Sequence, residues 1–407
     1  MVISYIIFKV LGAALATVSL GFLVIASKKA RPAKWERPRW IAGLVAGLLI
    51  FAFSATPLPS VIGYPFLAKT YGPSIGPSLP LKMVAEFFAH LQKFDQVTDI
   101  AADPSSVPPP IERTEPQVVK IDLTAKEVLA EVAPGVMLNY WTFNGQVPGP
   151  MLRVREGDTV ELTLHNDASS LHTHSIDLHA VTGPGGGAAV MQVAPGASKS
   201  FRFLARNPGL FVYHCASPNV AVHNSHGQYG MILVEPKGGL PKVDREYYVM
   251  QGELYTQGRL GERGLQAFDA GKMLDGHPEY VVFNGRVNGT VGNMKAKRGE
   301  RIRIFFGNGG VNLVSSFHAI GEVFDDVYPE ASMGGDLHHN VQTTLVPAGG
   351  ATIVEMGLEV PGKLILVDHA LARLDRGAWG TIQVDGDPNP EVFQALSPQE
   401  PGSMGGH

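Results

Sequence analysis

The residues with the greatest capacity for chemistry lie in two segments, LHTHSIDLHAVTG at 171–183 and FVYHCASPNVAVHNSHGQYGM at 211–231. The second segment contains Cys215, which is the only cysteine of the chain and therefore cannot form an internal disulfide. His214 precedes Cys215, and His223 follows it by eight residues. One thiolate and two imidazoles make the trigonal ligand set of a blue-copper electron-transfer site. The pattern predicts a copper site around Cys215.

The alternation of side chains along a strand divides these residues between two sites. Successive side chains of a strand point to opposite faces. His174 therefore faces away from Asp177 and His179. His214 likewise faces away from its neighbour Cys215. Two strands can each serve two sites, so the sequence predicts two metal centres joined through adjacent residues. The predicted clusters are His174, Cys215 and His223, and Asp177, His179 and His214.

The remaining histidines of the chain have a simpler interpretation. A single histidine in a strand is more often a core or surface residue than a metal ligand. A lone cysteine is likewise usually a small apolar residue, but the histidines that flank Cys215 favour copper there. The histidines without a predicted ligand role are His172, His226, His277, His338 and His339.

Composition limits the class of protein. The chain has 407 residues, enough for two or more domains that each bury a core. Charged residues make up 17% and the formal net charge is −4, without a basic stripe, so nucleic acid is not an expected partner. The 47 glycines and 30 prolines indicate a turn-rich chain with many short strands.

Two apolar segments near the N-terminus predict a membrane anchor. Residues 2–27 and 40–55 are apolar, and the second segment extends to Tyr64 through a proline-containing end. About 20 apolar residues span a bilayer. The segment between them, KKARPAKWERPR, carries six positive residues against Glu36 and is expected to stay cytoplasmic. Residues 1–64 are thus predicted to be a two-helix transmembrane anchor in a bacterial inner membrane, with the later domains in the periplasm.

A cleaved signal peptide is the alternative interpretation of this N-terminus. In a signal peptide the positive charges precede the apolar core, whereas here they follow it. Two retained spans are therefore preferred, with membrane lipid as a partner.

Residues 65–116 are expected to connect the anchor to the globular part. The segment 79–94 has helical spacing of apolar residues and predicts an amphipathic helix on the membrane or on the globular part, with quinone binding as another possibility. The segment 103–116 is a proline-rich and fairly stiff linker. The apolar face of the helix comprises Met83, Phe87, Phe88 and Leu91.

An internal repeat begins after residue 116. Each copy contains several strands separated by glycine and proline turns, which predicts two tandem Greek-key β-sandwiches. The first domain is predicted at 117–240 and the second at 241–390, followed by a flexible tail at 391–407. The matching segments are 141–166 with 280–308, 193–215 with 346–369, and 229–236 with 378–386.

The two copies differ where the chemistry is expected. The second copy lacks cysteine and cannot hold a thiolate copper site, but it supplies His318 and His369. This difference predicts one electron-transfer centre per chain and one shared or composite centre.

The region 117–386 resembles the two-domain copper nitrite reductases, in particular members with the pattern YHCA…H…GxYGxILVEP. The resemblance implies an all-β soluble part of two cupredoxin-like sandwiches, here preceded by an α-helical two-span hairpin. It also implies one type-1 and one type-2 copper per chain. The implied type-1 ligands are His174, Cys215 and His223; the type-2 ligands are His179, His214 and His369. The implied acid–base pair is Asp177 and His318, with Ile320 crowding the substrate and Thr343 offering a hydroxyl nearby.

The implied activity is dissimilatory, one-electron reduction of nitrite to nitric oxide at the type-2 copper, with electrons from the type-1 copper. Three neutral imidazoles with an open fourth position suit a copper ion that binds a small anion. The reaction consumes two protons, which Asp177 and His318 are placed to handle. The resemblance further implies a homotrimer in which His369 reaches the type-2 copper of a neighbouring subunit.

The sequence departs from the family pattern at the axial position of the type-1 site. Relatives carry methionine five residues after the second histidine, where this chain has Gln228. A shifted register that uses His226 and Met231 would break the match of YG and ILVEP, so Gln228 is the predicted axial residue. An amide oxygen is a harder donor than a thioether and favours Cu(II), which predicts a lower reduction potential.

A low potential and a membrane anchor together suggest membrane quinol as the electron donor, with a periplasmic cytochrome or cupredoxin as the alternative. Two other functions compete. A multicopper oxidase needs several His-x-His pairs, but only His172 and His174 form one, and Ala216 follows Cys215. A membrane-tethered blue-copper electron carrier would leave His179, His214, Asp177 and His318 without a role.

Overall fold

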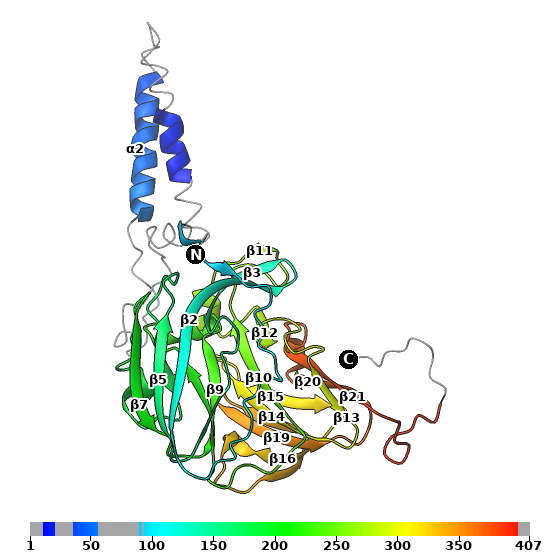
Figure 1. Cartoon of the computed structure of the whole chain (residues 1–407). Coiled ribbons are helices and arrows are strands. Elements are labelled where there is room, and N and C mark those ends of the chain that lie inside the picture. Colours follow the sequence, from blue (N-terminus) through cyan, green and yellow to red (C-terminus); the bar gives the residue numbers. More distant parts are fainter. Residues whose placement is uncertain (1–10, 21–35, 56–88, 92, 398–407) are drawn as a thin grey trace. The chain divides into compact units, whose positions relative to one another are not determined.

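The computed structural model describes residues 11–20, 36–55, 89–91 and 93–397. The chain divides into two compact units, with residues 1–69 and 74–83 in the first and the rest in the second. In the first unit residues 11–20 are helical and α2 spans Glu36–Ala55. The second unit is a β structure, drawn in Figure 1 in colours from cyan to red.

Four sheets make two sandwiches in the second unit. One sheet of the first sandwich has the order β11-β3-β2-β5-β7, with β1 beside β2, and the other has the order β4-β9-β8-β6. The bounds are β1 Asp95–Gln96, β2 Val118–Ala133, β3 Val136–Phe143, β4 Leu152–Arg155, β5 Thr159–Asn166, β6 Asp177–Leu178, β7 Ser198–Leu204, β8 Gly209–His214, β9 Tyr229–Glu235 and β11 Gly264–Leu265.

The second sandwich has sheets in the order β12-β10-β14-β19-β16-β17 and β13-β21-β20-β15-β18. Their bounds are β10 Arg245–Leu254, β12 Tyr280–Phe283, β13 Met294–Lys297, β14 Arg301–Asn308, β15 Ser315–Ile320, β16 Phe324–Tyr328, β17 His338–Val341, β18 Thr343–Val346, β19 Ala351–Gly357, β20 Gly362–Asp368 and β21 Trp379–Asp385. Short helices are α5 Val220–Ser225, α6 Ala270–Leu274 and the 3-10 turns η1 Pro184–Gly187, η2 Pro329–Ala331 and η3 Leu371–Arg373.

The sandwiches repeat the same strand pairings. In the first, β2 runs parallel to β5 and β5 antiparallel to β7; in the second, β10 runs parallel to β14 and β14 antiparallel to β19. The parallel pair β4–β9 likewise corresponds to β13–β21, and β8–β9 to β20–β21. The predicted all-β, two-domain organisation of the repeat is confirmed.

Alternation of apolar and polar residues explains why these segments form strands. In β5 the sequence TVELTLHN buries every second residue, including Val160, Leu162 and Leu164. A strand with this pattern places one face in a core and the other towards solvent. Each sandwich has its own buried cluster, and a third cluster combines residues of both. Members of this shared core are Tyr140, Tyr229 and Met231 from the first sandwich and Tyr248, Met250 and Phe305 from the second.

A buried network of charges also joins the two sandwiches. Arg153 of β4 forms ion pairs with Glu235 and with Glu246, which lies in the second sandwich. Arg303 pairs with the same Glu246 and with Glu355. Since a buried charge without its partner is strongly destabilising, these contacts restrain the relative position of the sandwiches.

The segment predicted as a linker packs on both sandwiches. In the first sandwich, Nη1 of Arg153 donates to the carbonyl oxygen of Pro108 at 2.6 Å. The N–H of Tyr248 donates to the carbonyl oxygen of Pro104 at 2.8 Å. Most of the predicted helix at 79–94 lies outside the described residues.

In the first unit, α2 packs closely on the helical residues 11–20. A Cβ atom built on Gly43 would lie 2.7 Å from Oγ of Ser19, and one on Gly47 would lie 2.6 Å from the backbone nitrogen of Ala16. Only glycine allows such a close approach of two helices. Among the described residues, no helix is long and apolar enough to cross a membrane. The other parts of the predicted anchor at 1–64, and residues 398–407 of the predicted tail, lie outside the described residues.

Candidate metal centres

The end of β8 brings the predicted ligands together. Asp177 of β6 pairs with His214 of β8, and the N–H of Cys215 donates to the carbonyl oxygen of Gln228 at 3.0 Å. His174 is held in an isolated bridge to Val193. The side chains of His214 and Cys215 therefore leave the same strand end towards different clusters, as the sequence predicts.

The first cluster consists of His174, Cys215 and His223, all buried. Sγ of Cys215 lies 3.2 Å from Nδ1 of His223 and 4.0 Å from Nδ1 of His174. The N–H of Ser175 donates to the sulfur at 3.3 Å. One sulfur and two Nδ1 atoms that face one point form a type-1-like copper site.

Burial prepares these side chains to bind a metal. Burial lowers the pKa of His223 to about 3, so its ring is neutral at pH 7 and has a free nitrogen lone pair. Burial raises the pKa of the Cys215 thiol, but the contact with His174 and the backbone N–H groups of Ser175 and Ser217 outweigh it, and the pKa lies below its ordinary value. A thiolate is the form that binds a metal.

Gln228 lies at this site with its side chain fully buried. Its Oε1 is 3.3 Å from Nδ1 of His223, the nitrogen that faces Cys215. Its Nε2 has no hydrogen-bond partner among the described residues. The amide oxygen, not the amide nitrogen, is thus directed towards the ligand atoms.

The second cluster consists of Asp177, His179 and His214, in a half-exposed position. Nε2 of His179 and Nε2 of His214 are 3.1 Å apart, and Oδ2 of Asp177 is 3.9 Å from Nε2 of His214. Nδ1 of His214 is 2.9 Å from the carbonyl oxygen of Cys215, which fixes the ring. Burial, and then the neighbouring His214, lower the pKa of His179. Two imidazoles beside a carboxylate can hold a metal with open positions.

The residues predicted in the second sandwich form a separate group. The rings of His318 and His369 are 5.3 Å apart between centroids, with His318 in β15 and His369 directly after β20. Thr343 is the cross-strand partner of His318, and Ile320 lies two residues further on the same half-exposed face of β15. Within the described part of one chain, His369 is not a member of the cluster around His179.

Two residues close to the type-1-like site were not predicted. Glu127 of β2 is fully buried and contacts Nδ1 of His172 and Nε2 of His174. Burial raises the pKa of the Glu127 carboxyl, but its contacts with His172 and His174 outweigh burial and hold the pKa well below its usual range. Glu127 alternates along the strand with Leu123 and Ala125, which face the core, so a buried carboxylate at this position was the signal available in the sequence.

Trp141 is the other residue that was not predicted. Its ring lies 4.5 Å from that of His223, measured between centroids, and stacks on His226 at 4.3 Å. It also lies 4.3 Å from the ring of His172. His172 and His226, two of the five histidines without a predicted ligand role, therefore contact Trp141 and belong to neither metal cluster.

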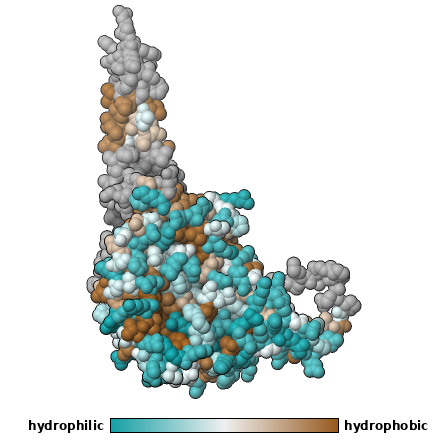
Figure 2. Space-filling view, viewed as in Figure 1, coloured by the Kyte–Doolittle hydropathy of each residue, from teal (hydrophilic) through white to brown (hydrophobic). Residues whose placement is uncertain are grey.

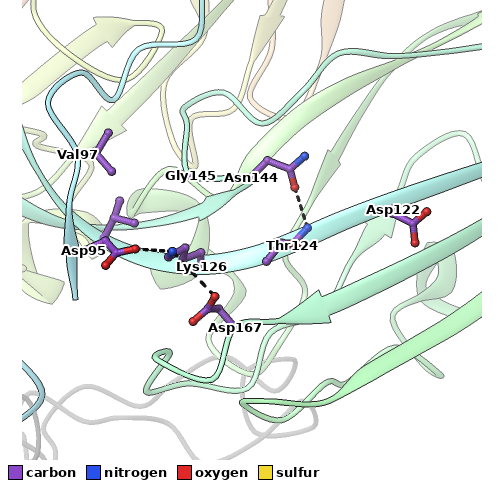
Figure 3. A pocket seen from close by; sticks show the side chains of 9 residues that line it. Asp95, Val97, Asp122, Thr124, Lys126, Asn144, Gly145 and Asp167 are labelled. Atoms are coloured by element: carbon purple, nitrogen blue, oxygen red, sulfur yellow. Dashed lines mark hydrogen bonds and ion pairs between the residues drawn. The ribbon is translucent and has the colours of Figure 1, made fainter. Parts of the chain in front are cut away.

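A groove of about 510 Å³ lies on the outer side of β2. Asp95, Lys126 and Asp167 meet across it, and Lys126 pairs with both carboxylates (Figure 3). None of its lining residues belongs to the metal clusters.

Comparison with known proteins identifies the family. The chain is 51% identical over 312 residues to the copper-containing nitrite reductase of Neisseria meningitidis serogroup A, covering 75% of this chain and 79% of that protein. It is 34% identical over 304 residues to the copper-containing nitrite reductase of Neorhizobium galegae, covering 69% and 79%. The chain belongs to the copper-containing nitrite reductases.

A solved nitrite reductase structure agrees with this assignment, and a multicopper oxidase structure and family model are similar in fold. The copper nitrite reductase of Nitrosomonas europaea superimposes with a TM-score of 0.59 at 37% identity, covering 67% of this chain and 96% of that chain. A multicopper oxidase structure superimposes with a TM-score of 0.57 at 29% identity, covering 66% and 89%. Residues 124–239 match the multicopper oxidase family model. Both sandwiches of this nitrite reductase are thus cupredoxin-like.

The position of Gln228 generates a test of its role. The substitution Gln228→Met should raise the type-1 reduction potential, because a thioether favours Cu(II) less than an amide oxygen does. We expect at least a tenfold shift of the equilibrium towards Cu(I), which is ~59 mV for a one-electron couple. The measurement is a spectroelectrochemical titration of the thiolate absorption band.

The matched control is Gln251→Met, which should leave the type-1 potential unchanged. Gln251 is a fully buried glutamine of the second sandwich that accepts a hydrogen bond from Ser315 and is absent from the metal clusters. An unchanged or lowered potential in Gln228→Met would refute the axial assignment.

Proposed function

We propose that this nitrite reductase transfers single electrons from the cluster around Cys215 to the cluster around His179, where nitrite is reduced to nitric oxide. The adjacency of His214 and Cys215 carries this proposal, since one peptide unit connects a ligand of each cluster. When bound, copper would supply a one-electron carrier at the first cluster and a Lewis acid for the anion at the second.

The side chains near the second cluster provide the protons. Asp177 lies within reach of the position between His179 and His214 and can hold or donate a proton there. His318 is proposed as the second proton donor, supplied with His369 by another copy of the chain, because within one chain it lies in the separate group. Thr343 and Ile320 are its neighbours across and along the strand. We propose that Ile320 narrows the space for the substrate and that the Thr343 hydroxyl supports the site.

The two metal clusters also argue against the competing functions. Within the described residues only these two groups could hold a metal. A multicopper oxidase would need a trinuclear centre and about four copper ions per chain, whereas we expect one type-1 and one type-2 copper. An electron carrier would need only the first cluster.

Replacement of a ligand in the second cluster tests the function. We expect His179→Ala to reduce nitrite turnover by more than the roughly 10–100-fold that loss of an outer partner costs. The thiolate absorption should remain, because His179 does not contact Cys215. Nitrite turnover and the visible spectrum are the measurements.

A surface histidine supplies the control. His165→Ala removes a histidine whose ring contacts Ser198 and Asp122 in strands of the same sandwich, and it should leave nitrite turnover and the thiolate absorption unchanged. Full nitrite turnover by His179→Ala would contradict the proposal.

We further propose that the type-2 site is completed between copies of the chain in a homotrimer. The cluster around His179 has two imidazoles, and His369 lies in the separate group with His318. A third imidazole from His369 of another copy would complete a three-histidine site. Closed rings with one kind of head-to-tail interface are a common form of homo-oligomer.

Mixing of two inactive variants tests this arrangement. His179→Ala and His369→Ala should each lack nitrite turnover. Mixed trimers should recover activity, because random mixing gives about a quarter of the interfaces an intact ligand set when the site lies between subunits. Nitrite turnover after co-expression and purification by two tags is the measurement. If mixed trimers form but show no nitrite turnover, the type-2 site lies within one chain.

We propose that residues 1–64 anchor the enzyme in the bacterial inner membrane with the copper domains in the periplasm, and that membrane quinol is the electron donor. Large apolar side chains are exposed on the described helices of the first unit, including Leu11 at 57% and Leu49 at 64%. Figure 2 shows brown, apolar surface on these helices. Small residues at close helix contacts, such as Gly43 and Gly47, are typical of membrane helices. An anchor raises the effective concentration of quinol at the enzyme.

Turnover of the full chain in detergent tests the donor. We expect nitrite-dependent oxidation of a quinol analogue by the wild-type protein, and its loss in His179→Ala under the same conditions. The measurement is the quinol absorbance with nitric oxide detection. Nitrite reduction with a soluble reduced cytochrome or cupredoxin, but never with the quinol, would assign the alternative donor.

A further inference from the structure

Glu127 places a buried carboxylate next to a ligand of the type-1-like site. Its Oε1 accepts hydrogen bonds from the backbone N–H groups of Leu171 and His172, both at 2.8 Å. Nδ1 of His172 lies 2.9 Å from the same oxygen. The carboxylate therefore holds the loop that leads into His174.

The same oxygen faces the ring of His174. Nε2 of His174 is 3.4 Å from Oε1 of Glu127, while Nδ1 of that ring faces Sγ of Cys215. Neither Nε2 of His174 nor Oε2 of Glu127 has a hydrogen-bond partner among the described residues, so Nε2 approaches the carboxylate and has its N–H still available to it. The imidazole thus lies between a carboxylate on one side and the metal site on the other.

The second sandwich has an equivalent carboxylate without a metal site. Oε1 of Glu253 in β10 accepts from the N–H groups of Asn312 at 3.2 Å and Leu313 at 2.8 Å. The loop that contains Asn312 and Leu313 leads to Ser315 at the start of β15. Ser315 occupies the position in the second sandwich that His174 occupies in the first. Loop anchoring is therefore common to both sandwiches, whereas the contact with a metal-ligating imidazole occurs only at Glu127.

We propose that Glu127 is a positioning residue that orients His174 and lowers the reduction potential of the type-1 centre. A carboxylate that accepts the N–H of a ligating histidine fixes its tautomer and makes it a stronger donor. A stronger donor stabilises Cu(II) over Cu(I). A buried negative charge acts in the same direction, because charges interact strongly where water is excluded. Glu127 and Gln228 would both lower the reduction potential of the type-1 centre. This inference rests on the proposed function, in which the cluster around Cys215 is that centre.

The substitution Glu127→Gln tests this role. Glutamine has the same length and retains an oxygen for the two loop N–H groups, but it removes the charge. We expect the type-1 potential to rise by at least a tenfold shift of the equilibrium, ~59 mV. Cu(II) affinity should fall roughly 10–100-fold. Spectroelectrochemistry and competition with a chelator measure the two effects.

Glu253→Gln is the matched control, because it makes the same change at the loop anchor of the second sandwich. The type-1 potential of Glu253→Gln should equal that of the wild type, although both variants are expected to be less stable than the wild type. An unchanged potential in Glu127→Gln, or an equal shift in both variants, would overturn the proposal.

A second experiment leaves Glu127 unchanged and replaces the imidazole of His174 instead, so it can be done even if Glu127→Gln does not fold. In His174→Gly, added imidazole can bind copper through one nitrogen and donate to Glu127 with the other, whereas 1-methylimidazole cannot donate. A higher type-1 potential with 1-methylimidazole supports the role of Glu127, and equal potentials exclude it. Neither readout depends on nitrite, so failure of the proposed reaction would be distinguished by turnover of the wild-type enzyme alone.

Discussion

The two metal clusters of this protein are connected by two consecutive residues at the end of β8 whose side chains point in opposite directions. His214 and Cys215 are consecutive, so the pleat of the strand directs an imidazole to one cluster and a sulfur to the other. The pairing of Asp177 with His214 then places the residues of β6 beside both of these ligands. Any change in the register of β6 and β8 would move all these ligands together. The two sandwiches and their shared core hold that register.

Burial gives the type-1-like site its chemical character. It keeps His223 neutral, and local contacts hold Cys215 below its ordinary pKa. Two oxygen groups, from Gln228 and Glu127, lie next to the ligating rings and not in solvent. We propose that each favours Cu(II), so that side chains outside the three ligands set the reduction potential. A lower potential in turn fits a strongly reducing donor.

The second sandwich shows which features of the repeat serve folding and which serve chemistry. Both copies have the same strand pairings, and both bury a glutamate that binds two N–H groups of a loop. Copper ligands occur around this glutamate only in the first copy. The second copy instead presents His318 and His369 on its surface. This division of roles is consistent with the proposed site between two copies of the chain.

The sequence alone determined the two clusters, the repeat and the all-β domains, because strand parity and ligand spacing are local properties. It also singled out Gln228 as the departure from the family pattern. Glu127 and Trp141 emerged only in the structure, since their partners lie in other strands and loops that the chain brings together by folding. The close packing of residues 103–116 on both sandwiches could not be predicted either, because a proline-rich segment has no periodicity that reports its contacts. The separation of His369 from His179 likewise depends on how two sandwiches pack, which no local pattern specifies.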